Sequence, residues 1–91
     1  MNLHRETRGD ITILRPVGRL DSATSPELER AVLERIEAGA SRLVFDLSEM
    51  DYVSSAGLRV ILTTAKKAKA AGGGLTIACA KNNVKEVLAV S

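Results

Sequence analysis

The chain has 91 residues, of which 45% are hydrophobic and 26% are charged, so we expect one soluble, cytoplasmic domain over residues 1–91. Its net charge of +2 and its aromatic content of 2% argue against nucleic-acid binding, which needs basic surfaces and stacking rings. The sequence lacks both the ~20-residue apolar run that spans a bilayer and the apolar core of a signal peptide, so we expect no membrane insertion.

The start of the chain predicts a β-hairpin. Residues 2–8 form a weak strand, and Gly9 with Asp10 suits a two-residue turn. Residues 11–17 are rich in residues that favour strands. Within them, Pro16 indicates an edge strand or a bulge, because proline cannot donate a hydrogen bond to a neighbouring strand.

A loop over residues 18–23 leads to the first predicted helix. This helix begins at Thr24 or Ser25, where Thr24 and Glu27 have the spacing of a capping box. Gly39 is a natural end for it. The helix carries an apolar stripe that predicts packing against a sheet, made of Leu28, Ala31, Val32, Leu33 and Ile36.

The second half of the chain alternates strands and helices. We expect a buried strand over residues 43–47, a helix over 55–71 and, after three glycines at 72–74, a strand over 75–80. A third helix runs from Asn83 to Val90. This order predicts an α/β fold with a mixed sheet, an N-terminal hairpin and βαβ crossovers, and with helices packed on the sheet.

The last residues have two further features. The apolar stripe that begins at Val84 stops at Ser91 without a capping glycine or a basic final turn, which suggests a short C-terminus or an element borrowed from a partner. Cys79 is the only cysteine, so it has no partner for an internal disulfide. We expect it to be a small core residue.

The segment 51–62 is the most informative part of the sequence. It joins a strand to a helix and places Ser54 and Ser55 at the joint, among backbone N–H groups that have no partner inside the helix. A hydroxyl there either caps the helix or accepts a phosphate, which a helix N-terminus accommodates. A cap needs only one hydroxyl, and Ala56 and Gly57 are small enough for a partner to approach. Both uses remain open.

Signatures of catalysis are absent. His4 is the only histidine and lies near a terminus, and with one cysteine the chain cannot form a zinc site or a Cys–His pair. Residues 53–57 do not match the Gly-x-Ser-x-Gly motif, and the glycines at 72–74 follow a helix, unlike those of a phosphate-binding loop. We therefore expect no enzyme, no metal and no cofactor.

Three segments resemble the STAS domain, and more narrowly the bacterial anti-sigma factor antagonists, also called anti-anti-sigma factors. Residues 51–59, preceded by the strand 43–47, resemble the family's serine motif. Residues 18–21 and 72–78 resemble its second and third landmarks. The resemblance extends over residues 2–91 and implies a single STAS domain. It also implies one more strand and helix after the third helix, and we expect this C-terminal pair to be missing.

The resemblance also implies roles for individual residues. Ser55 matches the serine that family kinases phosphorylate, and Asp21 matches an acidic loop residue near the partner-binding face. Ser54 stands where the best-studied members have aspartate, and Ala56 where they often have serine or threonine. The implied partner surface consists of Asp21, Ser54, Ser55, Ala56, Gly57 and Leu58.

The function implied by the resemblance is partner switching. Unmodified antagonist binds an ATP-dependent serine kinase that is also the anti-sigma factor, and the sigma factor is released. Phosphorylation of Ser55 ends this binding, and a serine phosphatase restores it. Asp46, Glu49 and Asp51 predict an acidic neighbourhood that repels the added phosphate. We expect a monomer, with a swapped dimer as the alternative if a sheet edge is left open.

Two other roles stay open at this point. In the first alternative, the domain is a STAS module that senses a small molecule or belongs to a transport or lipid-trafficking complex. A co-purifying transporter or a bound ligand would indicate this role. Alternatively it is an enzyme, for instance a degenerate nucleotide-binding α/β domain, which saturable turnover of a substrate would indicate.

Overall fold

The computed structural model describes residues 1–78 and 80–89. Its elements alternate as predicted, and the α/β class, the mixed sheet, the N-terminal hairpin and the three helices are confirmed. In chain order they are β1 (Asn2–Arg8), β2 (Ile11–Leu20), α1 (Ser25–Glu37), β3 (Arg42–Asp46), β4 (Met50–Val53), α2 (Ser55–Ala70), β5 (Gly74–Ala78) and α3 (Asn82–Ala89). The short strand β4 is additional to the prediction.

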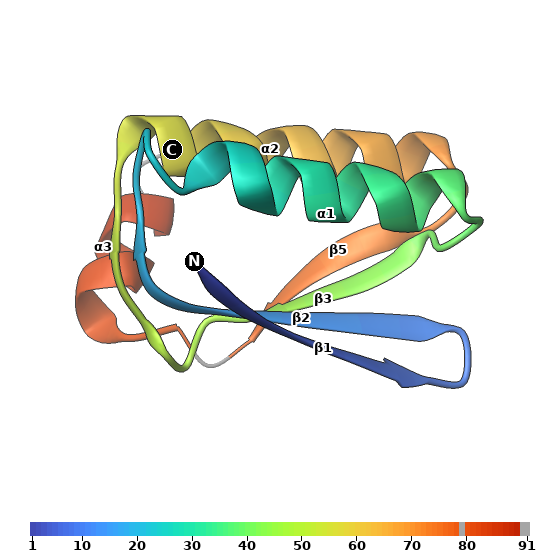
Figure 1. The fold of residues 1–91 in the computed structure, drawn as a ribbon, viewed down its shortest axis with the longest axis horizontal. Helices are drawn as coiled ribbons and strands as arrows, with labels where there is room; N and C mark the ends of the chain where they lie inside the picture. The colour runs from blue at the N-terminus through green and yellow to red at the C-terminus, as the bar shows by residue number, and fades with distance from the viewer. Residues whose placement is uncertain (79, 90–91) are drawn as a thin grey trace.

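β2 is the long central strand of the sheet (Figure 1). It pairs antiparallel with β1 and parallel with β3, and β3 pairs parallel with β5. Near its end β2 changes partners, because Ile11–Leu14 pair with β3 whereas Gly18–Leu20 pair with β4. Pro16 lies between these stretches. The predicted edge strand is therefore wrong, and the irregularity in register falls between Gly18 and Arg19.

β4 explains two errors of the sequence prediction. The expected loop over residues 18–23 is shorter, because β2 continues to Leu20 in order to pair with β4. β4 itself has buried ends and an exposed middle, without the alternation that marks a half-buried strand. A tight turn leads into it, in which the backbone N–H of Ser48 donates to Oδ1 of Asp46 at 3.0 Å.

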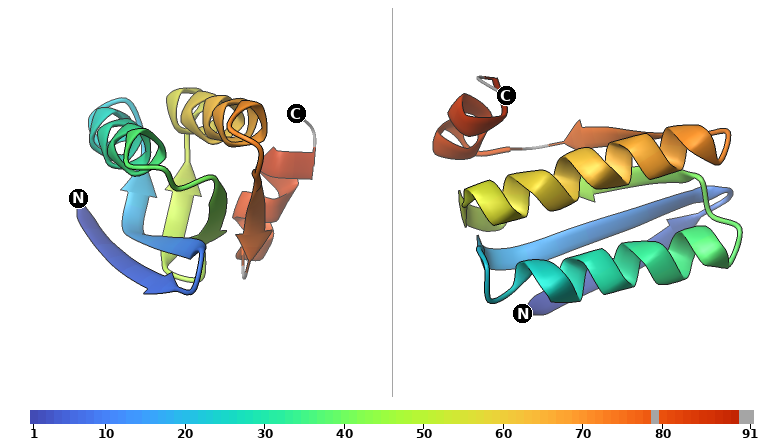
Figure 2. Two further views of the ribbon diagram at one scale, coloured as in Figure 1. Left: turned by 90° about the vertical axis from the view of Figure 1, so that its right-hand side faces the viewer. Right: turned by 90° about the horizontal axis from the view of Figure 1, so that it is seen from above.

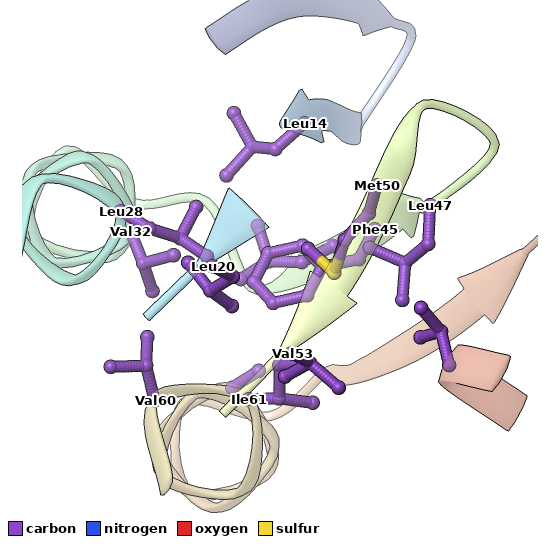
Figure 3. Packing of buried hydrophobic residues seen from close by; sticks show 13 residues of the cluster. Leu14, Leu20, Leu28, Val32, Phe45, Leu47, Met50, Val53, Val60 and Ile61 are labelled. Atoms are coloured by element: carbon purple, nitrogen blue, oxygen red, sulfur yellow. The ribbon is translucent and has the colours of Figure 1, made fainter. Parts of the chain in front are cut away.

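α1 and α2 lie side by side over one face of the sheet, and α3 lies beside β4 at one end (Figures 1 and 2). The core fills the space between the helices and the sheet (Figure 3), with Phe45 of β3 fully buried in it. Leu28, Ala31 and Val32 of the predicted α1 stripe are buried. The other buried apolar side chains are Leu14, Leu20, Leu43, Leu47, Met50, Val53, Val60, Ile61, Ala68 and Val84.

The C-terminal part of the described chain contains both a strand and a helix, β5 and α3. They correspond to the strand and the third helix that the sequence predicted. The expectation that a further strand and helix are missing after α3 has no support in the structure. Val84 of α3 is fully buried, so this helix takes part in the core. Cys79 lies outside the described residues, and its predicted core position stays a prediction. Within residues 1–78 and 80–89, every helix is too short or too polar to cross a membrane.

Candidate partner-binding site at the start of α2

The site forms where β2 and β4 end together. Leu20 is in register with Val53, and the backbone N–H of Ser54 donates to the Leu20 carbonyl at 2.9 Å. Asp21 follows Leu20 directly, while Ser54 and then Ser55 follow Val53. The parallel pairing thus brings the predicted acidic residue and the two predicted serines, which are more than thirty positions apart in the sequence, to the same edge of the sheet.

Ser54 and Ser55 have different roles at the start of α2. Ser54 is the N-cap of α2 with extended backbone angles, and its Oγ accepts a hydrogen bond from the N–H of Gly57 at 3.2 Å. Ser55 is the first helical residue and is exposed. Among the described residues, its hydroxyl has no hydrogen-bond partner. The cap is therefore Ser54, and the Ser55 hydroxyl is available for other chemistry.

We predict that the two serines differ in their contribution to stability. Ser54→Ala removes the cap and should lower the free energy of unfolding by about 1 kcal/mol. Ser55→Ala removes an exposed, unbonded hydroxyl and should change that free energy by less than ~0.5 kcal/mol. Urea unfolding followed by circular dichroism measures both. Equal losses for the two variants would contradict this assignment.

Gly57 fixes the distance between α2 and the end of β2. It is buried, and a Cβ atom at this position would lie 2.7 Å from the Leu20 carbonyl oxygen and 2.8 Å from Leu20 Cγ. Only glycine permits so close an approach. The neighbouring Ala56 and Leu58 are half-buried, and Leu58 packs against the edge of the core. Of the predicted surface residues, Gly57 thus has a packing role, while Ser55 is the most open to a partner.

Asp21 organises the turn that leads into α1. Its Oδ1 accepts hydrogen bonds from the backbone N–H groups of Thr24, at 3.2 Å, and Ala23, at 3.0 Å. These bonds hold the pKa of Asp21 below its ordinary value, Thr24 having the larger effect, and the nearby Arg19 guanidinium adds a smaller contribution. Asp21 is therefore a carboxylate at neutral pH, half-buried beside the start of α2.

The predicted capping box of Thr24 and Glu27 does not form. Thr24 is the N-cap of α1, but its side chain accepts no hydrogen bond from the helix. The Thr24 hydroxyl instead donates to the Arg19 carbonyl at 2.8 Å and accepts from the N–H of Asp21 at 3.0 Å. The spacing is that of a capping box, but the Thr24 hydroxyl is already hydrogen-bonded within the turn that contains Asp21.

Two of the three carboxylates of the expected acidic neighbourhood form ion pairs. Glu49 pairs with Arg15 at 3.1 Å, and Asp51 pairs with Lys81 at 2.6 Å. Asp46 accepts the backbone hydrogen bond of the tight turn before β4. Glu49 and Asp51 are therefore paired with cations, and like-charge repulsion from these two carboxylates is a poor explanation for a phosphate switch.

Sequence reasoning missed a cation beside the site. The Arg19 guanidinium carbon lies 4.2 Å from the centre of the Tyr52 ring, and its Nε lies 3.7 Å from Asp21 Oδ2. Tyr52 is 41% exposed, unusual for a large hydrophobic residue of this chain. The only signal for the pair is the register of β2 against β4, which the sequence did not reveal. In the part of the chain that the structure describes, no group of three or more His, Cys, Asp or Glu side chains is placed to hold a metal ion.

Comparisons with known proteins agree with this architecture. In sequence, the chain is 39% identical over 74 residues to BtrV of Bordetella bronchiseptica, a candidate anti-sigma factor antagonist, and the match covers 81% of this chain but only 64% of BtrV. In structure, it is similar to a candidate antagonist from Thermotoga maritima, with a TM-score of 0.91 and 21% identity, covering 97% of this chain and 76% of the other.

The anti-sigma factor antagonist SpoIIAA has the same fold in two states. Its unphosphorylated form matches with a TM-score of 0.82 and 15% identity, covering 99% of this chain and 84% of SpoIIAA. The phosphorylated form from Bacillus matches with a TM-score of 0.79 and 17% identity, covering 98% and 82%. These identities establish the fold alone. The STAS domain family model matches residues 2–91, and the chain therefore belongs to the STAS domain family.

Proposed function

We propose that this protein is an anti-sigma factor antagonist that binds an anti-sigma factor and is switched off by phosphorylation of Ser55. The observation that carries the proposal is the division between the two serines, because Ser54 caps α2 and the exposed Ser55 hydroxyl is left without a bond among the described residues. The family and the sequence similarity to BtrV support the antagonist role. No catalytic step by the domain itself is part of this function.

The start of α2 suits a phosphate without a change of fold. A phosphate on Ser55 carries a charge of about −1.5 to −2 and lies at the positive end of the helix dipole. Ser54 keeps its hydrogen bond to Gly57, so the helix need not fray when Ser55 is modified. That SpoIIAA has this fold in unphosphorylated and phosphorylated forms is consistent with this view.

The proposed partners follow from this chemistry. The anti-sigma factor is a serine kinase that uses ATP to modify Ser55, and a serine phosphatase reverses the modification. The contact surface comprises Asp21, Ser54, Ser55, Ala56, Gly57 and Leu58. Asp21 lies beside the joint of β4 and α2, so a kinase that reaches Ser55 also meets the Asp21 turn.

Phosphate mapping tests the proposal. The protein is isolated from the cells that naturally produce it, as wild type and as Ser54→Ala and Ser55→Ala variants, and analysed by intact-mass and peptide mass spectrometry. We expect one phosphate on Ser55 in the wild type and in Ser54→Ala, and none in Ser55→Ala. A phosphate on Ser54, or no phosphate on either serine under any growth condition, would show that the switch is not built on Ser55.

A further inference from the structure

The outer face of α2 continues from Ser55 along the helix. The buried residues Gly57, Val60, Ile61, Thr64 and Ala68 define the inward side. On the opposite side lie Ser55, Arg59, Leu62 and Lys66, spaced by three or four residues and all exposed. We call these four residues the α2 outer face.

Leu62 is an unusual residue for such a surface. It is 47% exposed, and among the described residues only Leu62 and Tyr52 are large hydrophobic side chains that remain exposed. A single exposed leucine is common in proteins. This one lies two turns from the proposed phosphorylation site, in the middle of a row of cations.

The charges of α2 have one sign. The helix contains Arg59, Lys66, Lys67 and Lys69 and no acidic residue, whereas the adjacent α1 has four glutamates and two arginines. The helix dipole favours Lys67 and Lys69 in the last turn. It disfavours Arg59, which lies near the N-terminus. No ion pair involves any of the four α2 cations within residues 1–78 and 80–89.

We propose that the α2 outer face is the docking surface for an acidic region of the anti-sigma factor. Arg59 and Lys66 pair with carboxylates of that region, and Leu62 packs into an apolar contact between them. The charge complementarity comes from the unpaired cations of α2, and the inference rests on the proposed antagonist function.

This surface also explains how a phosphate on Ser55 would weaken binding of the partner. A phosphate on Ser55 stands one turn before Arg59, in the order that favours an ion pair along a helix. The phosphate draws Arg59 away from the partner and repels the partner's carboxylates. Charge repulsion then arises across the interface, and the already paired Glu49 and Asp51 are not needed for it.

Binding to the purified anti-sigma factor tests the docking surface. The unphosphorylated protein is titrated calorimetrically as wild type, Arg59→Glu, Lys66→Glu and Leu62→Ser, with Arg30→Glu on the exposed side of α1 as the matched control. We expect each α2 variant to bind at least about tenfold more weakly, as for residues central to an interface. Arg30→Glu should bind like wild type, and high salt should weaken the wild type more than Lys66→Glu. Circular dichroism verifies that each variant is folded.

Three results separate the possible failures. Wild-type affinity of all three α2 variants, together with weaker binding by Ser55→Glu, would disprove the docking surface and leave the proposed function intact. A wild type that binds no anti-sigma factor would disprove both. The third result concerns vesicles that contain phosphatidylglycerol. If these vesicles bind the wild type but not Lys66→Glu, while the anti-sigma factor binds both proteins equally, the surface binds lipid and the inference is wrong.

Discussion

Phosphorylated Ser55 should reduce the affinity for the anti-sigma factor several-hundredfold, a loss of ~3–4 kcal/mol at ~1.4 kcal/mol per tenfold. The phosphate adds charge and bulk at an exposed position on the proposed contact surface, and it must be desolvated there. Calorimetric titration of the phosphorylated and unphosphorylated chains measures the difference. Ser55→Glu should reproduce part of the loss, because a carboxylate carries less charge than a phosphate.

Two controls make this result specific. Ser55→Ala should stay bound to the anti-sigma factor, because alanine is small and uncharged and cannot be phosphorylated. The phosphorylated protein should unfold at nearly the same temperature as the unmodified one, since Ser54 still caps α2. Equal affinities before and after phosphorylation would exclude the switch. A large loss of thermal stability would instead mean that the phosphate acts by unfolding the domain.

Gly57→Ala should destabilise the domain by about 1–3 kcal/mol, the usual cost of forcing an extra carbon into a packed site. The expected sign is informative, because alanine in place of glycine inside a helix ordinarily stabilises by ~1 kcal/mol. Here the new methyl group would meet the Leu20 carbonyl oxygen at 2.7 Å. α2 must move away from β2, so the variant should also bind the anti-sigma factor more weakly.

Gly74→Ala is the matched control for this substitution. A Cβ atom at Gly74 meets no other atom within 4 Å, so the change should leave urea unfolding nearly unaltered. Greater resistance of Gly57→Ala to urea than wild type would show that helix propensity outweighs the contact with Leu20. The close approach of α2 to β2 would then have no structural importance.

The sequence was sufficient for the parts of the fold that depend on local patterns. The turn at Gly9, the apolar stripe of α1 and the strand–helix alternation of the second half needed only nearby residues. β4 was missed because its middle residues, Asp51 and Tyr52, are both exposed and break the alternation. Its existence depends on pairing with the end of β2, which is remote in sequence.

The residues that the sequence assigned to the candidate site do meet at one edge of the sheet, but their individual contacts could not be predicted. Both serines were recognised, yet only the backbone geometry shows that Ser54 is the cap. The neighbouring charges were misjudged because their partners come from other elements, as Lys81 does for Asp51. Contacts made by the tertiary fold determine which hydroxyl is free and which carboxylates form ion pairs. The composition of the sequence near the motif does not reveal them.

The carbonyl of Leu20 links the end of β2 to the start of α2, and this limits how the domain can respond to phosphorylation. It accepts the N–H of Ser54 and abuts Gly57, so the strand end that carries Asp21 and the helix start that carries Ser55 are joined at one atom. Neither half of the site can shift without the other, which leaves little freedom for a hinge. In the proposed switch the domain keeps one conformation, and the partner distinguishes the two states by the phosphate itself and not by a rearrangement of the fold.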